Sequence, residues 1–227
     1  MRVLAIDTAL GACSAAILDT ADDGIVASES LPMVRGHAEA LMPLLHRIAQ
    51  QVQIGFSELD RVAVTTGPGS FTGLRVGIAA ARGIALSINK PAVGLSTLAA
   101  YAAPHLADDD NAPVVVAIDA RHDHVYLQAF GPGGRSVIDP RLAPLREAVR
   151  AAASAPVRIV GSAAQAVAAA LSPKDAAPIL VDARATPGID WVARMGAALP
   201  ERQSPPKPQY LRAPDAQPQN AAQLPRR

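Results

Sequence analysis

Short apolar runs divided by turn-forming residues predict an α/β chain in which strands and helices alternate. In the first half the pattern predicts strands at residues 2–7, 13–19, 24–30, 61–66 and 91–95, with helices at 37–53, 72–89 and 97–103. In the second half it predicts strands at 114–119, 125–130, 157–160 and 179–181, with helices at 145–153, 163–171 and 189–199. Because short turns join the first three strands, we expect them to form an antiparallel meander. Both halves open with a strand that ends in Asp, followed by a second strand, which indicates an internal duplication.

The helix at 37–53 has a wider apolar face than one sheet contact requires. Its apolar positions cover an arc of roughly 160°, whereas about 100° is enough for packing on a sheet. These positions are Ala38, Leu41, Met42, Leu44, Leu45, Ile48, Ala49 and Val52. Deep burial and a second, partner-facing surface both explain the extra width.

The helix at 74–88 separates into two faces. The face expected to pack on the core contains Leu74, Gly77, Ile78, Ala81, Ile84, Ala85 and Ile88. A second side carries Arg75, Ala79, Arg82 and Leu86. Packing within the lobe alone would account for this helix, but the surplus apolar surface on both helices favours a partner face.

Composition and charge narrow the function classes. The formal net charge is +1, which argues against a general electrostatic attraction to nucleic acid or to an anionic membrane. Cys13 is the only cysteine, so no intramolecular disulfide can form, and this fits a reducing compartment. No apolar run reaches the roughly 20 residues that a membrane span needs, and the first residues lack the pattern of a signal peptide. We therefore expect a cytoplasmic protein with no membrane contact.

The run Gly67-Pro-Gly-Ser-Phe-Thr-Gly73 is the most specific local motif. Two glycines permit positive φ, and Ser70 or Thr72 can cap the helix that follows. The run is not a Walker A loop, because no Gly-Lys-Ser/Thr follows, and it is not a Rossmann fingerprint, because its glycines are spaced G-x-G-x-x-x-G and the strands before it form a meander. A tight strand-to-helix turn and an anion site at the helix start are equally good interpretations.

Asp7 and Thr8 end the first strand just before a turn of small residues. An acid and a hydroxyl at such a place can face the metal and phosphates of a nucleotide. An Asp at a strand end also caps its own turn through backbone N–H groups, and this structural interpretation is favoured about two to one.

No pattern in the chain predicts a catalytic metal or a serine nucleophile. The five histidines include no H-x-x-x-H pair, and solvated surface histidines are the better interpretation. None of Ser14, Ser70 and Ser96 lies in a G-x-S-x-G or S-x-x-K motif.

Several collinear segments resemble the TsaB (YeaZ) family, which supports synthesis of threonylcarbamoyladenosine in tRNA. The matching segments are Leu4-Ala-Ile-Asp-Thr8 with Cys13-Ser14, His37-Ala-Glu39 with Leu41 and Pro43, Gly67-Pro-Gly-Ser-Phe-Thr-Gly-Leu-Arg75, Gly94-Leu-Ser-Thr-Leu98, Ala117-Ile-Asp-Ala-Arg121 with Val125-Tyr126, and Pro208-Gln-Tyr-Leu-Arg212. The run that ends at Arg75 is close to diagnostic. The resemblance implies an actin-like (ASKHA, RNase H-like) two-lobed fold, with a mixed sheet flanked by helices in each lobe.

The resemblance also implies a paralogous partner, TsaD, which carries the catalytic metal and transfers the threonylcarbamoyl group. The histidine pair of TsaD-like proteins falls in register on Thr97 and Tyr101, neither of which replaces an imidazole ligand. The Ser-Gly-Gly phosphate loop expected in the second lobe is replaced by Asp119-Ala-Arg121. We therefore expect a supporting subunit with no catalytic residues, no metal and no cofactor of its own. ATP and metal belong to the partner subunits.

These expectations divide the chain into an RNase H-like lobe with partner-binding helices at 1–110, a smaller RNase H-like lobe at 111–212, and a disordered tail at 213–227. The residues expected at the partner interface are Leu41, Met42, Leu45, Ala49, Arg75, Ala79, Arg82 and Leu86. Those expected to form a vestigial anion- or nucleotide-facing site are Asp7, Thr8, Gly67, Gly69 and Ser70.

The expected partners are a TsaD-type paralogue and a TsaE-type ATPase that acts on the heterodimer, with a homodimer when the chain is alone. Contact with tRNA is expected only through the complex. The alternative function is a metal-dependent hydrolase or phosphotransferase of the actin-like class, active on its own. The missing histidine pair argues against that alternative.

Overall fold

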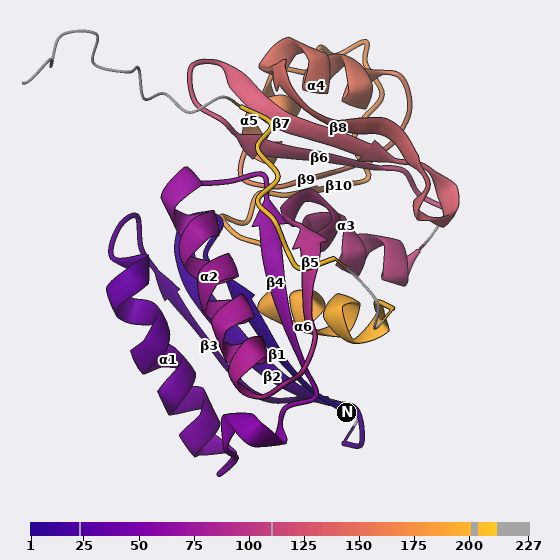
Figure 1. Cartoon of the computed structure of the whole chain (residues 1–227). Helices are drawn as coiled ribbons and strands as arrows, with labels where there is room; N and C mark the ends of the chain where they lie inside the picture. Colours follow the sequence, from indigo (N-terminus) through magenta and orange to yellow (C-terminus); the bar gives the residue numbers. More distant parts are fainter. Residues whose placement is uncertain (23, 110, 201–203, 213–227) are drawn as a thin grey trace, which may run out of the picture.

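Two five-stranded mixed sheets, one from each half of the chain, form the framework of the molecule (Figure 1). The computed structural model describes residues 1–22, 24–109, 111–200 and 204–212. The first sheet has the order β3 (Gly24–Pro32), β2 (Ala12–Asp19), β1 (Arg2–Asp7), β4 (Arg61–Gly67) and β5 (Ala92–Ser96). The second has the order β10 (Leu180–Asp182), β9 (Arg158–Val160), β6 (Val114–Asp119), β7 (His124–Phe130) and β8 (Ser136–Pro144).

The two sheets repeat one pairing scheme around a central strand. In the first sheet β1 pairs antiparallel with β2 and parallel with β4, and in the second β6 pairs antiparallel with β7 and parallel with β9. The antiparallel pairs β1–β2 and β2–β3 confirm the expected meander. The arrangement is the actin-like, two-lobed α/β fold that the resemblance implied.

Two helices cover the outer face of each sheet. Helices α1 (His37–Gln51) and α2 (Phe71–Ser87) lie on the first sheet, where Leu44, Ile48 and Ile78 meet the apolar side chains of β1, β2 and β4. Helices α4 (Leu145–Ala153) and α5 (Ala164–Ala169) cover the second sheet in the same way. Because both faces of the sheet centres are buried, the central strands β1, β2 and β6 are almost continuously apolar.

The inner face of each sheet is covered by a helix from the other half of the chain. Helix α3 (Thr97–Asp108) packs on β6, with Leu98, Tyr101 and Ala102 against the second sheet. Helix α6 (Ile189–Ala198) packs on β1 and β4 of the first sheet. The lobe boundary between residues 110 and 111 stays a prediction. Helix α6 comes from the second half of the chain but packs on the first sheet, so this boundary in the sequence does not separate the packing of the two lobes. An apolar helix packs equally well on either sheet, so periodicity alone does not show where it lies.

A buried arginine caps the last turn of α3 and of α6, which we call the exchanged helices because each packs on the sheet of the other half of the chain. Arg61, the first residue of β4, donates through Nη1 to the carbonyl oxygens of Gly196, Ala197 and Leu199 at the end of α6. Arg158, the first residue of β9, donates through Nη1 to the carbonyl oxygens of His105 and Asp109 at the end of α3. A cation at a helix C-terminus satisfies free carbonyls and complements the helix dipole.

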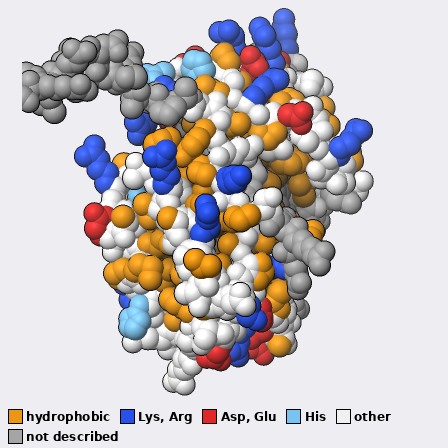
Figure 2. Space-filling view, viewed as in Figure 1, with side chains coloured by type: hydrophobic (Ala, Val, Ile, Leu, Met, Phe, Trp, Pro, Cys, Tyr) orange, Lys and Arg blue, Asp and Glu red, His pale blue; other side chains and the backbone are white. Residues whose placement is uncertain are grey.

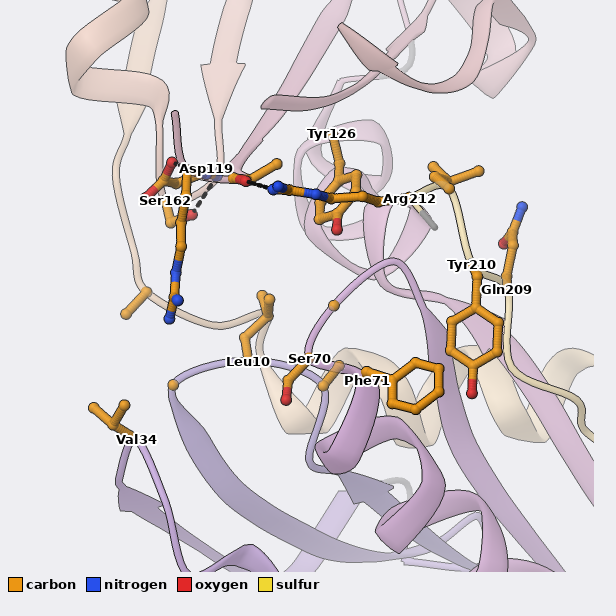
Figure 3. A pocket seen from close by; sticks show the side chains of 17 residues that line it. Leu10, Val34, Ser70, Phe71, Asp119, Tyr126, Ser162, Gln209, Tyr210 and Arg212 are labelled. Atoms are coloured by element: carbon orange, nitrogen blue, oxygen red, sulfur yellow. Dashed lines mark hydrogen bonds between the residues drawn. The ribbon is translucent and has the colours of Figure 1, made fainter. Parts of the chain in front are cut away.

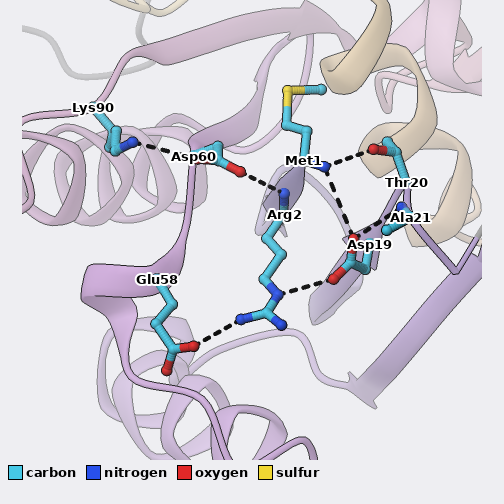
Figure 4. A network of polar contacts seen from close by, with 8 residues as sticks. All are labelled: Met1, Arg2, Asp19, Thr20, Ala21, Glu58, Asp60 and Lys90. Carbon is cyan, nitrogen blue, oxygen red and sulfur yellow. Dashed lines mark hydrogen bonds and ion pairs between the residues drawn. The ribbon is translucent and has the colours of Figure 1, made fainter.

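Charged side chains tie the N-terminus to the end of the first sheet (Figure 4). Arg2 donates through Nε to Asp19 at 2.9 Å and through Nη1 to Glu58 at 2.8 Å. Asp60 accepts from the Arg2 backbone N–H at 2.9 Å and pairs with Lys90. Ion pairs at the surface add little stability, so this network fixes local geometry more than it holds the fold together.

The hydrophobic pattern missed one strand. β8 is an edge strand of the second sheet, and it contains Pro140 and Pro144. Proline interrupts the strand pattern but is tolerated at a sheet edge, where a ladder hydrogen bond is not required. The predicted disordered tail at 213–227 lies outside the described residues. In the described part of the chain, no helix is long and apolar enough to cross a membrane.

Candidate functional site

A cavity of about 520 Å³ lies between the two lobes (Figure 3). The first lobe contributes Leu10, Ser70 and Phe71, and the second contributes Asp119, Tyr126 and Ser162. Residues 209–212, from the end of the described chain, complete the wall. In an actin-like fold this cleft is where the two strand-end turns converge, so it is the first place to look for ligand-binding residues.

Asp7 and Thr8 are buried, and neither is among the side chains that line this cavity. Asp7 Oδ1 accepts hydrogen bonds from the backbone N–H of Ala9 at 3.0 Å and from Thr65 Oγ1 at 2.5 Å. Thr8 Oγ1 donates to the carbonyl oxygen of Gly73 at 2.7 Å. Burial raises the pKa of the Asp7 carboxyl, and the two hydrogen bonds, which lower this pKa, only partly offset the increase. These contacts match the structural interpretation, in which Asp7 caps its own turn.

The glycine motif packs backbone against backbone on that same turn. The backbone N–H of Ser70 donates to the carbonyl oxygen of Ala9 at 2.7 Å, and Ser70 Oγ caps α2 by accepting from the N–H of Gly73. A Cβ at Gly69 or Gly73 would collide with the carbonyl oxygen of Ala9 or Thr8. The glycines are therefore required for close approach, and at least two N–H groups of the loop are used inside the protein. This supports the tight-turn interpretation over the anion site.

The corresponding turn of the second lobe is open to solvent. Asp119 is exposed, and its Oδ1 accepts from the backbone N–H of Arg121 at 2.8 Å. Arg121, His122 and Asp123 all have positive φ, at 63°, 53° and 58°. Three consecutive non-glycine residues in the left-handed region cost conformational energy, which the flanking strands must offset.

Thr97 and Tyr101 lie side by side on α3 in the core between the lobes. Tyr101 OH donates to the carbonyl oxygen of Arg184 at 3.2 Å, and burial raises the pKa of this phenol. Burial also raises the pKa of the Cys13 thiol to about 11, so the thiolate that a nucleophile needs is scarce. Across residues 1–22, 24–109, 111–200 and 204–212, no three His, Cys, Asp or Glu side chains are grouped as metal ligands.

The predicted interface residues fall into two sets. All four on α2 are exposed, namely Arg75, Ala79, Arg82 and Leu86. Met42 of α1 is 51% exposed, and Leu86 is 84% exposed. Figure 2 shows hydrophobic side chains gathered over the face that α1 and α2 form. We use the name outer face from here on for the surface formed by Met42, Arg75, Ala79, Arg82 and Leu86.

Leu41, Leu45 and Ala49, also predicted at the interface, are buried, so they are not accessible to a partner. Leu41 and Leu45 belong to the core cluster on the first sheet. Of the two explanations for the wide apolar arc of α1, deep burial accounts for these positions. Met42 and Ala38 are the apolar residues of that arc that remain exposed.

A strap formed by residues 204–212 was not recognised as part of the site. Tyr210 stacks on Phe71 with ring centroids 4.9 Å apart, and Arg75 lies 3.8 Å above the Phe71 ring. Arg75 Nε also donates to Tyr210 OH at 3.0 Å. The sequence signal for this strap is the run Pro208-Gln-Tyr-Leu-Arg212. The strap contains no helix or strand, so it has no periodic pattern of apolar residues from which its contacts could be predicted.

Comparisons with known proteins agree on one family. The family model described as TsaD, tRNA N6-adenosine threonylcarbamoyltransferase, matches residues 24–161. The tRNA threonylcarbamoyladenosine biosynthesis protein TsaB of Escherichia coli (strain K12) is 38% identical over 130 residues, which are 57% of this chain and 55% of that protein. An uncharacterised protein of Mycobacterium tuberculosis (strain ATCC 25618 / H37Rv) is 33% identical over 220 residues, covering 95% of this chain and 94% of that protein.

Solved structures give the same result. A crystal structure of an uncharacterised protein with similarity to peptidase YeaZ, from Pseudomonas aeruginosa, has a TM-score of 0.73 and 28% identity, covering 93% of this chain and 99% of that one. The structure titled YeaZ from Pseudomonas aeruginosa has a TM-score of 0.69 and 26% identity, covering 87% and 91%. The matches to the Escherichia coli and Haemophilus influenzae TsaB proteins span only about half the length of those relatives.

Proposed function

The chain belongs to the TsaB (YeaZ) family, and from this premise we propose that it is a non-catalytic subunit that pairs with a TsaD-type paralogue. In that complex it supports formation of threonylcarbamoyladenosine in tRNA. The exposed outer face on α1 and α2 is the observation that carries the proposal, because Met42 and Leu86 are large apolar side chains left in solvent on neighbouring helices. Such surface on a monomer is typical of an interaction site.

The pairing would be a contact between helix pairs. A paralogue with the same fold carries an equivalent pair on its own outer face, and two such pairs can pack as four helices. Ala79 lies exposed at the centre of α2, and Gly83 has no neighbour within 4 Å of the position of a Cβ. Small residues there allow the two chains to approach closely. Without the paralogue, a second copy of this chain would take its place as a homodimer.

The proposal assigns metal, ATP and chemistry to the partner subunits. Thr97 and Tyr101 are buried in the core between the lobes, and neither side chain supplies a neutral imidazole. A TsaE-type ATPase would act on the heterodimer, and tRNA would reach this chain only through the complex.

Co-expression with a TsaD-type paralogue tests the proposal. We expect the two chains to elute together in gel filtration with a mass that fits one copy of each or a multiple. The purified chain alone should not hydrolyse ATP, whereas turnover by the chain alone would favour a phosphotransferase. Failure to associate with the paralogue would contradict the proposed function.

A further inference from the structure

Arg75 is an exposed cation that the protein holds in one orientation. Its guanidinium lies 3.8 Å above the ring of Phe71, and its Nε donates to Tyr210 OH at 3.0 Å. Phe71 and Tyr210 are themselves stacked at an interplanar angle of 30°. In the described part of the chain, no carboxylate lies within 4.0 Å of this guanidinium. The two outer nitrogens of the fork are therefore positioned without an ionic partner.

The strap that carries Tyr210 is fixed on both sides of the contact. The backbone N–H of Gln209 donates to the carbonyl oxygen of Thr66 at 2.7 Å, and Arg212 Nη1 donates to the carbonyl oxygen of Ala120 at 2.8 Å. Gly67, at φ 119°, leaves room for the strap, because a Cβ there would lie 2.6 Å from the carbonyl oxygen of Gln209. Tyr210 thus holds Arg75 from a segment that is anchored to both lobes.

The charge of the outer face is one-sided along α2. The helix from Phe71 to Ser87 contains Arg75 and Arg82 and no Asp or Glu. Seven residues at 1.5 Å per residue place the two arginines about 10 Å apart along the helix. A second copy of this chain would bring the same two cations of α2 to the contact. A partner with carboxylates at the facing positions would be favoured over self-association.

We propose that Arg75 is the anchor of this face and takes a carboxylate of the TsaD-type partner as a bidentate ion pair. This rests on the proposed function, because it names the chemistry by which the same surface selects its partner. The planar fork of arginine matches the two oxygens of a carboxylate. Phe71 and Tyr210 hold the fork before binding, so less side-chain entropy is lost when the pair forms. Tyr210 acts through Arg75 and is a positioning residue.

The test compares Arg75→Lys with Arg82→Lys, because both keep the charge and only the first removes a held, planar fork. The probe is the purified TsaD-type paralogue, titrated calorimetrically at low and high salt, with melting measured on each preparation. We expect Arg75→Lys to weaken binding about tenfold, and Arg82→Lys to weaken it less than about threefold. Tyr210→Phe keeps the stack and removes the hydroxyl. We expect it to weaken binding about threefold, with unchanged melting of the free chain.

Equal affinities for Arg75→Lys and Arg82→Lys would overturn the inference. Ala79→Glu separates that failure from failure of the proposed function. If Ala79→Glu abolishes binding while Arg75→Lys leaves it unchanged, the interface stands and the role of Arg75 is lost. If Ala79→Glu binds as tightly as the unmodified chain, the outer face is not the interface. A tenfold loss for Arg75→Lys with no loss for Tyr210→Phe would remove the positioning role of Tyr210.

Discussion

The outer helices of the two lobes differ far more than the sheets beneath them. In the first lobe α1 and α2 have 15 and 17 residues, whereas α4 and α5 in the second have 9 and 6. The long pair exposes Met42 and Leu86, and among the described residues no large apolar side chain of α4 or α5 is exposed. The second sheet is also the smaller one, because β9 and β10 have only three residues each. The proposed function assigns the exposed surface of α1 and α2 to a partner.

The inner sides of the lobes are alike by contrast. Each sheet receives a helix from the other half of the chain, and each of these helices ends on a buried arginine, Arg61 or Arg158. The two halves of the chain are thus alike in their sheet pairing and in the core between the lobes, and they differ in their outer helices. The internal duplication itself stays a prediction.

The largest effect is expected from removing the buried arginines. Arg61→Ala leaves three helix-end carbonyls without this donor and Arg158→Ala leaves two, and we expect each substitution to lower the free energy of unfolding by about 3 kcal/mol. Urea denaturation followed by circular dichroism measures this. If only one of the two substitutions is destabilising, the Arg61 cap of α6 and the Arg158 cap of α3 are not equivalent, which contradicts the similarity of the two lobes on their inner sides.

The next effect concerns the outer side. Ala79→Glu replaces a small residue in the proposed interface with a bulky charged one, one helical turn from both Arg75 and Arg82, and we expect it to weaken binding of the TsaD-type paralogue about 100-fold. Ala79 is exposed, so the free chain should melt as before.

Ala166→Glu, on an exposed position of α5, is the matched change on the second lobe. It should leave affinity unaltered. A loss of binding for Ala166→Glu comparable with that for Ala79→Glu would place part of the interface on the second lobe.

The smallest effect distinguishes the two strand-end aspartates. Burial raises the pKa of Asp7 above its ordinary value of 3.8, so the folded state binds the proton more tightly than the unfolded state. Stability is therefore lost as pH rises from the unfolded pKa through the folded pKa. We expect Asp7→Asn to be more stable than the unmodified chain at neutral pH, with the advantage disappearing below about pH 4.

Asp119 is exposed, so Asp119→Asn should change stability little at either pH. Melting temperatures measured across this range check both variants. An Asp7→Asn advantage that grows as pH falls would contradict the cause assigned to the raised pKa.

Periodicity predicted most of the elements because apolar residues mark the buried side of each strand and helix. It also identified the α2 residues of the outer face, where Arg75, Ala79, Arg82 and Leu86 fall on the exposed side. It could not distinguish exposed Met42 from buried Leu41 and Leu45 on α1, because the width of an apolar face does not show which part of that face is buried. The exchange of α3 and α6 and the contacts of Tyr210 depend on distant segments, which local sequence does not specify.

Hydrogen–deuterium exchange with and without the TsaD-type subunit is the most direct test of where the partner binds. We expect slower exchange on binding in peptides from α1 and α2, including the start of α2 around Phe71 and Arg75. Peptides from α4 and α5 should exchange as fast as in the free chain. Protection confined to α4 and α5, with none over α1 and α2, would contradict the claim that the outer face of the first lobe is the partner surface.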